Sequence, residues 1–99
     1  MTINTIDDLY TQREQILELA DKHGATNIRI FGSFARGDAN DNSDIDFLVT
    51  WDYQHVSAWG GVGFDLELET LLGRSVDVIS DKSLNPYLKD DILAEAVPL

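Results

Sequence analysis

Residues 32–49 read GSFARGDANDNSDIDFLV, and the order of the neighbouring elements follows from this stretch. A dense cluster of turn formers at positions 37–43 separates two segments that are typical of strands. The first segment, residues 27–31, breaks at Gly32, and the second, residues 45–51, is rich in β-branched and aromatic residues. We therefore expect two short strands joined by a turn-rich connection that carries polar side chains.

A helix is predicted before the first strand. Thr5 and Asp8 form a capping-box pattern, and apolar residues follow at helical spacing. Gly24 stands where a left-handed cap would end that helix. His23, in the last turn, is expected to interact with the helix dipole rather than take part in chemistry.

The second half of the chain is expected to add a crossover and a third strand. The predicted segments are a loop (residues 52–63), a helix (64–72, closing at Gly73), a strand (75–79) and a last helix from Pro86 to about Val97. The order α-β-β-α-β-α places the chain in the α/β class, with a small mixed sheet and helices packed on one face. At 99 residues, we expect a single domain spanning positions 1–99.

Composition excludes several kinds of protein. The chain has 7 Lys and Arg against 18 Asp and Glu, a net charge of −11, so it lacks the basic stripe that direct nucleic-acid binding needs. The absence of cysteine excludes disulfides, thiolate metal sites and a cysteine nucleophile. Met1 leads into a polar, acidic segment with no apolar run, so we expect a cytoplasmic protein without a membrane segment.

Three carboxylates are expected to meet at one place. Asp44 and Asp46 alternate with the apolar Ile45 and Phe47, so both aspartates project from the same face of their strand. Asp77 lies between two valines of the third strand in the same way. Two like charges about 4 Å apart cost roughly 4 kcal/mol at an effective dielectric near 20. The cluster must therefore take up protons or hold divalent cations, and its oxygen ligands suit Mg²⁺ or Mn²⁺.

The turn after the first strand has the features of a phosphate cradle. Gly32 allows a ligand to approach the backbone closely, and Ser33 offers a hydroxyl beside main-chain N–H groups. Arg36 could meet a phosphate. A Gly-Ser pair alone is a common turn, but here it is followed by the aspartates on adjacent strands. The combination predicts a nucleotide site with a metal clamp.

The joint pattern resembles the minimal nucleotidyltransferase group of the DNA polymerase beta superfamily. The similar segments are GSFARG (residues 32–37), SDIDFLV (43–49), SVDVI (75–79), LNPYL (84–88) and AVPL (96–99). The resemblance covers roughly residues 15–99 and implies the polymerase-beta-like nucleotidyltransferase fold.

The resemblance also implies a set of site residues. Asp44, Asp46 and Asp77 would be the catalytic residues and the ligands of two Mg²⁺ ions, and Asp77 would also help to deprotonate the nucleophile. The nucleotide triphosphate would lie on Gly32 and Ser33, with Asp44 and Asp46 reaching it through the metals. Arg36 would neutralise triphosphate charge.

Stand-alone members of this group resemble the MntA-type antitoxins of HEPN/MNT toxin–antitoxin pairs. The resemblance implies a protein adenylyltransferase that transfers AMP from ATP to a tyrosine hydroxyl of a cognate HEPN-domain ribonuclease toxin. Because 99 residues leave little room for an acceptor-binding domain, we expect the acceptor to be part of another molecule. Two alternatives stay open: a non-catalytic antitoxin that neutralises its partner by occlusion, and a small-molecule transferase like the aminoglycoside-modifying relatives.

Overall fold

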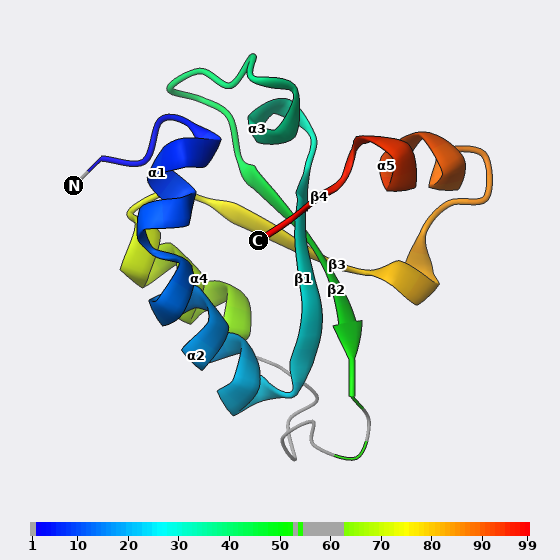
Figure 1. Ribbon diagram of the computed structural model, residues 1–99, viewed down its shortest axis with the longest axis horizontal. Helices are drawn as coiled ribbons and strands as arrows, with labels where there is room; N and C mark the ends of the chain where they lie inside the picture. The colour runs from blue at the N-terminus through cyan, green and yellow to red at the C-terminus, as the bar shows by residue number, and fades with distance from the viewer. Residues whose placement is uncertain (1, 53, 55–62) are drawn as a thin grey trace.

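A four-stranded mixed sheet forms the centre of the computed structural model, which describes residues 2–52, 54 and 63–99 (Figure 1). The strands are β1 (Ala25–Phe31), β2 (Ile45–Trp51), β3 (Val76–Ser80) and β4 (Val97–Pro98), in the order β3-β2-β1-β4. β1 is antiparallel to both β2 and β4, whereas β2 and β3 are parallel. A parallel pair requires a crossover, and most of the predicted loop at residues 52–63 lies outside the described residues.

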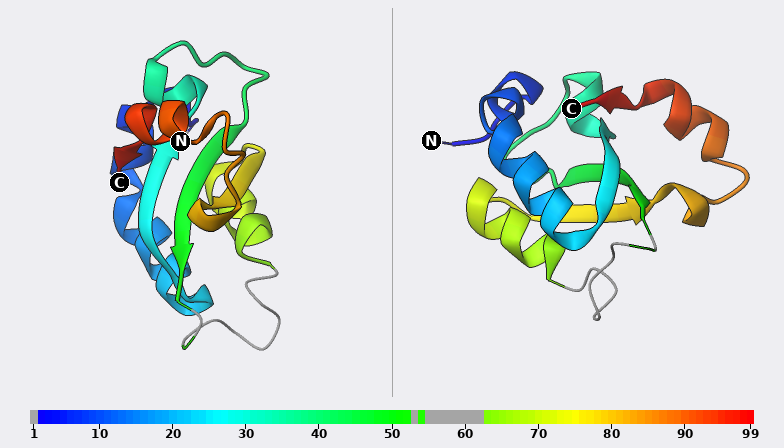
Figure 2. Two further views of the ribbon diagram at one scale, coloured as in Figure 1. Left: turned by 90° about the vertical axis from the view of Figure 1, so that its right-hand side faces the viewer. Right: turned by 60° about the horizontal axis from the view of Figure 1, so that its bottom comes forward.

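The helices that cover the sheet gather mainly on one side. They are α1 (Ile6–Thr11), α2 (Arg13–His23), α3 (Ser33–Arg36), α4 (Phe64–Leu72) and α5 (Lys89–Glu95), with a short 3₁₀ turn, η1 (Asp81–Ser83). In Figure 1 and in the right-hand view of Figure 2, α2 and α4 lie next to each other, and α5 lies apart from them. The expected α/β class, with a small mixed sheet and helices on one face, is confirmed.

The core lies between the sheet and α1, α2 and α4. Ile45, Phe47 and Val49 point into it from β2 and are fully buried, whereas Asp46 and Thr50, on the opposite face of the strand, are only partly buried. Leu48, which lies between them on that face, is also fully buried. The other core residues include Ile3, Leu9, Ile16, Ile30, Phe34, Phe64, Leu68, Leu72 and Val76. The strand alternation that fills the core therefore turns the aspartates to the opposite face.

The first helix differs from its prediction, because the chain forms two helices separated at Gln12. The capping box is present: the Asp8 amide donates to Thr5 Oγ1 at 3.4 Å, and the Thr5 amide donates to Asp8 Oδ2 at 3.1 Å. The Thr11 hydroxyl donates to the Asp8 carbonyl at 2.6 Å, a local bond that competes with the helical ladder and bends helices. The left-handed cap at Gly24, with φ 79°, is as predicted.

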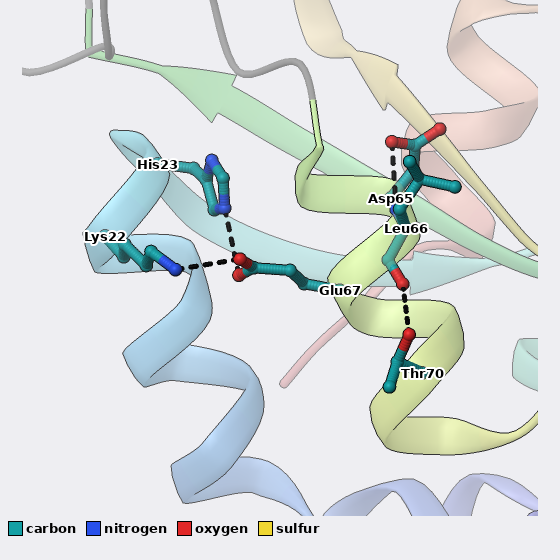
Figure 3. A network of polar contacts seen from close by, with 6 residues as sticks. All are labelled: Lys22, His23, Asp65, Leu66, Glu67 and Thr70. Carbon is teal, nitrogen blue, oxygen red and sulfur yellow. Dashed lines mark hydrogen bonds and ion pairs between the residues drawn. The ribbon is translucent and has the colours of Figure 1, made fainter.

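His23 connects two helices. It is 8% exposed, and its Nε2 lies 3.1 Å from Glu67 Oε2 on α4. Lys22 Nζ donates to the other oxygen of the same carboxylate at 2.8 Å (Figure 3). The Phe64 ring lies 5.4 Å from the imidazole, centroid to centroid. This cluster fastens α2 to α4 over the core and is not part of the aspartate face.

The C-terminal helix is shorter than expected, and a strand follows it. Asn85 begins a turn, because its side chain accepts from the Tyr87 amide at 2.9 Å and its carbonyl accepts from the Leu88 amide at 2.9 Å. Pro86 therefore occupies the second position of a turn rather than the start of a helix. The chain then becomes extended at Ala96, and β4 pairs with the edge of β1. No helix in the described part of the chain is long and apolar enough to span a membrane.

Candidate active site

Two of the predicted acids lie directly opposite each other on the sheet. In the parallel β2–β3 pair, Asp46 is the register partner of Asp77, and the next pair is Phe47 with Val78. Paired residues share a face, so both carboxylates project away from the core. Asp44 immediately precedes β2 and is exposed, as is Asp77, whereas Asp46 is half-buried. The pairing of Asp46 with Asp77 places the sequence-predicted acids of two strands on the same face.

The electrostatics of Asp46 reflect these neighbours. Burial is the largest cause that raises the pKa of Asp46 from 3.8 to about 6, followed by the negative charges of Asp77 and Asp44. The positive charge of Arg36 acts in the opposite direction, and Glu95 adds a smaller increase to the pKa. All three predicted aspartates therefore interact electrostatically at one place. No hydrogen bond to the Asp46 carboxylate is among the causes of its raised pKa.

These acids do not form a complete metal cage. Within residues 2–52, 54 and 63–99, no group of three or more acidic, His or Cys side chains is arranged to hold a metal ion. Mg²⁺ usually binds through one or two carboxylates and completes its shell with water and substrate phosphates. The half-buried Asp46 carboxylate, with the negatively charged carboxylates of Asp44 and Asp77 near it as further oxygen ligands, fits such a partial site.

The Gly32 turn lies against Asp46. Gly32 has φ 75° and ψ −152°, a conformation that favours glycine, and it precedes the first residue of α3, Ser33. A Cβ atom at position 32 would collide with Asp46 Oδ2. Only glycine therefore permits this approach. The helix begins after Gly32, so Gly32 occupies the cap position, and the first N–H groups of such a helix have no partner within it.

Arg36, at the end of α3, is already paired. Its Nη1 donates to Glu95 Oε1 at 2.7 Å and its Nε donates to Asp38 Oδ2 at 3.3 Å. The bond with Glu95, and to a smaller extent the bond with Asp38, raises the pKa of Arg36. Glu95 was not predicted from the sequence: it is one acid among many, and nothing local indicates that α5 ends beside the turn.

Arg74 is a second residue that the sequence did not single out. Its Nη1 donates to the carbonyls of Asn40 and Ser43 at 2.8 and 2.9 Å, and its Nε donates to the Ile3 carbonyl at 2.9 Å. The guanidinium lies 5.2 Å from the centroid of the Phe34 ring in α3. Arg74 thus holds the connection between the Gly32 turn and the aspartates. A cavity of about 610 Å³ opens beside it, lined by residues 2–4, 41–44 and 72–75.

Comparison with known families agrees with this geometry. A family model described as a nucleotidyltransferase domain matches residues 12–99. The chain belongs to this family. The family expected from the motifs is therefore confirmed, and the match includes the Gly32 turn and all three aspartates of the nucleotidyltransferase.

Relatives of this nucleotidyltransferase carry adenylyltransferase names. A protein of Methanocaldococcus jannaschii named "Putative protein adenylyltransferase" is 41% identical over 97 residues, which are 98% of this chain and 97% of the relative. The protein adenylyltransferase MntA of Thermococcus cleftensis is 33% identical over 98 residues, covering 98% of this chain and 95% of that one. Each alignment spans nearly the whole length of this chain and of the relative.

Solved structures support the fold of the nucleotidyltransferase. A structure described as a "putative minimal nucleotidyltransferase" superposes with a TM-score of 0.81 at 40% identity, covering 96% of each chain. A toxin–antitoxin structure with AMP-PNP superposes with a TM-score of 0.65 at 24% identity, over 86% of this chain and 69% of that one. The second likeness is one of fold alone.

Proposed function

We propose that this nucleotidyltransferase is a Mg²⁺-dependent protein adenylyltransferase of a toxin–antitoxin pair. It would transfer AMP from ATP to a tyrosine hydroxyl of a HEPN-domain ribonuclease and thereby neutralise that toxin. The observation that carries the proposal is the pairing of Asp46 with Asp77 directly beside the Gly32 turn. The adenylyltransferase names of near full-length relatives and the toxin–antitoxin context of a fold relative favour this substrate class.

The residues of the site divide into two groups in this proposal. Asp44, Asp46 and Asp77 would hold Mg²⁺, with Mn²⁺ as a substitute. When bound, the cations supply charge neutralisation for the triphosphate and for the pyrophosphate leaving group. Gly32 would let the triphosphate approach the backbone closely, and Ser33 would bind it through its N–H group and its hydroxyl.

The proposed transfer step gives Asp77 the role of the base. Asp77 accepts the proton of the acceptor tyrosine as the phenolic oxygen forms a bond to the α-phosphorus of ATP. The bond between the α-phosphorus and the bridging oxygen breaks, and the electron pair leaves with pyrophosphate. The exposure of Asp77 leaves room for a hydroxyl that another protein brings. The cytoplasmic location expected from the sequence stays a prediction.

The test uses the protein together with the product of the neighbouring reading frame. Both are incubated with labelled ATP and Mg²⁺, and the partner is analysed by intact mass spectrometry. We expect the partner to gain the mass of one or more adenylyl groups on tyrosine. Asp77→Asn is expected to abolish the gain, whereas Asp91→Asn, an exposed acid of α5, retains it. An unmodified partner would overturn the proposal.

A non-catalytic antitoxin is the second candidate, and the net charge of −11 favours it because an acidic surface can cover a basic one. In that case the double variant Asp44→Asn, Asp46→Asn still neutralises the toxin. Loss of neutralisation in the double variant, with complex formation intact, favours the enzyme.

A further inference from the structure

Glu95 connects the C-terminal helix to the Gly32 turn. Its Oε2 accepts a hydrogen bond from the Gly32 amide at 3.1 Å, and its Oε1 accepts from Arg36 Nη1 at 2.7 Å. The side chain is 23% exposed, whereas Asp90 and Asp91 of the same helix are exposed. One carboxylate thus bonds to both ends of α3. We refer to these two bonds as the Glu95 link.

The sheet determines where Glu95 lies. Only one residue separates it from β4, in which Val97 pairs with Ile30 of β1. The Leu99 amide donates to the Ile28 carbonyl at 3.0 Å, which extends the attachment to the end of the chain. Figure 1 shows α5 leading directly into β4, alongside β1. The position of the Glu95 carboxylate is therefore set by β4, which is distant from the Gly32 turn in the sequence.

The turn needs such a support. The φ 75° and ψ −152° of Gly32 are open to glycine, but a glycine backbone can also leave them freely, so contacts must hold it in this one conformation. The Gly32 carbonyl accepts from the Arg36 amide at 3.0 Å within α3, and two acids contact Gly32 from outside that helix. Asp46 Oδ2 lies against the Cα of Gly32, and Glu95 accepts from its amide. Of these two acids, Glu95 bonds to the turn but belongs to neither strand of the aspartate pair.

We infer that Glu95 is a positioning residue for nucleotide binding, an inference that rests on the proposed function. The Glu95 link holds the Gly32 backbone in its bent conformation and keeps the Arg36 guanidinium beside the turn. It leaves the N–H groups of residues 33–35 outside the link. Glu95 also balances the charge of Arg36, so the turn meets the triphosphate as a pre-arranged set of donors. In this way the C-terminal strand supports the site.

The kinetic test compares Glu95→Ala and Glu95→Gln with the control variants Asp91→Ala and Asp91→Asn, which remove the same charge from the same helix. Because the Glu95 link consists of two charge-assisted bonds, Glu95→Ala is expected to raise the KM for ATP about tenfold and to change kcat less than about twofold. Glu95→Gln keeps one carbonyl acceptor and should recover part of the KM. The control variants should match the wild type.

Two outcomes overturn the inference. An unchanged KM in Glu95→Ala means that the turn needs no support from α5. A lower KM means that Glu95 competes with the triphosphate for Gly32 and Arg36 instead of preparing them. Urea denaturation separates positioning from global unfolding, and Glu95→Gln supplies the comparison should Glu95→Ala fail to fold.

A second readout is independent of the transfer reaction. In ¹⁵N-labelled protein, the Gly32 amide is expected to shift upfield and to exchange faster with solvent in Glu95→Ala than in Asp91→Ala. An unchanged Gly32 amide overturns the inference. If the wild type transfers no AMP although the Gly32 amide responds to Glu95, the proposed function fails and the Glu95 link stands.

Discussion

Replacement of Asp46 by asparagine is expected to stabilise the metal-free protein near neutral pH. The Asp46 carboxylate is half-buried, faces Asp77 and Asp44, and receives no hydrogen bond among the causes of its raised pKa. An asparagine of nearly the same shape removes the charge and breaks none of the bonds described for the site. A substitution at the centre of the candidate site therefore increases the free energy of unfolding.

The magnitude follows from the pKa. The rise from 3.8 to about 6 corresponds to about 3 kcal/mol at 1.36 kcal/mol per pKa unit. Because Asp46 is only half-buried, solvent screening reduces the expected gain to about 1–2 kcal/mol. The folded state binds the proton more tightly than the unfolded state, so ionisation destabilises the fold as the pH rises from about 4 to about 6. Above about pH 7 the gain is complete, and near pH 4 it is nearly lost.

Urea denaturation in EDTA measures this effect. The free energies of unfolding of the wild type and Asp46→Asn are compared at about pH 8 and about pH 4.5, where the calculated gain falls to about a third. Asp91→Asn is the control, since it removes an exposed charge outside the aspartate group. If Asp46→Asn is no more stable than the wild type at pH 8, burial and the neighbouring negative charges do not oppose the ionised Asp46 carboxylate as described.

Three further results are expected. Gly32→Ala should lower the free energy of unfolding by about 3 kcal/mol and abolish ATP binding, because of backbone strain and the collision with Asp46. Gly37→Ala, with φ 83° and no atom within 4 Å of the added Cβ, should lower the free energy of unfolding by only about 1 kcal/mol. Urea denaturation measures both losses and calorimetry measures ATP binding; equal losses of stability would contradict the collision. Arg74→Lys should lower the free energy of unfolding by about 2 kcal/mol, because an ammonium group cannot donate to the carbonyls of Asn40, Ser43 and Ile3 at once as the guanidinium does. An Arg74→Lys variant as stable as the wild type in urea denaturation would show that the positive charge alone is enough. Chelation of divalent cations should stop AMP transfer, and Mg²⁺ or Mn²⁺ should restore it in a filter-binding assay; transfer that continues in EDTA would exclude a metal-dependent step.

Local patterns predicted one strand of the site and one helix of the core. The strand at residues 45–51 and the helix at 64–72 have the predicted boundaries, because alternation and a closing Gly73 act over a few residues. The pairing of Asp46 with Asp77 also follows from alternation once the two strands are neighbours. The Gly32 turn was expected from its composition. The close approach of a ligand to Gly32 stays a prediction, and the structure shows the Asp46 carboxylate against this residue.

Contacts that are distant in sequence could not be predicted in the same way. Pro86 suits a turn as well as a helix start, and the Asn85 side chain decides between them. β4 has only two residues and is defined by its pairing with β1 rather than by a pattern of its own. Glu95 bonds to Gly32 across 63 residues of sequence, and Arg74 bonds to Ser43 across 31 residues. No local sequence signal marks either pair.

The central claim is that Asp46, Asp77 and the Gly32 turn act together as one nucleotidyl-transfer site. The most direct measurement is the intact mass of the partner after one incubation with ATP and Mg²⁺, carried out in parallel with the wild type, Asp46→Asn and Asp77→Asn. The account predicts adenylylated partner with the wild type and unmodified partner with both folded variants. Equal modification by the wild type and either variant would contradict it.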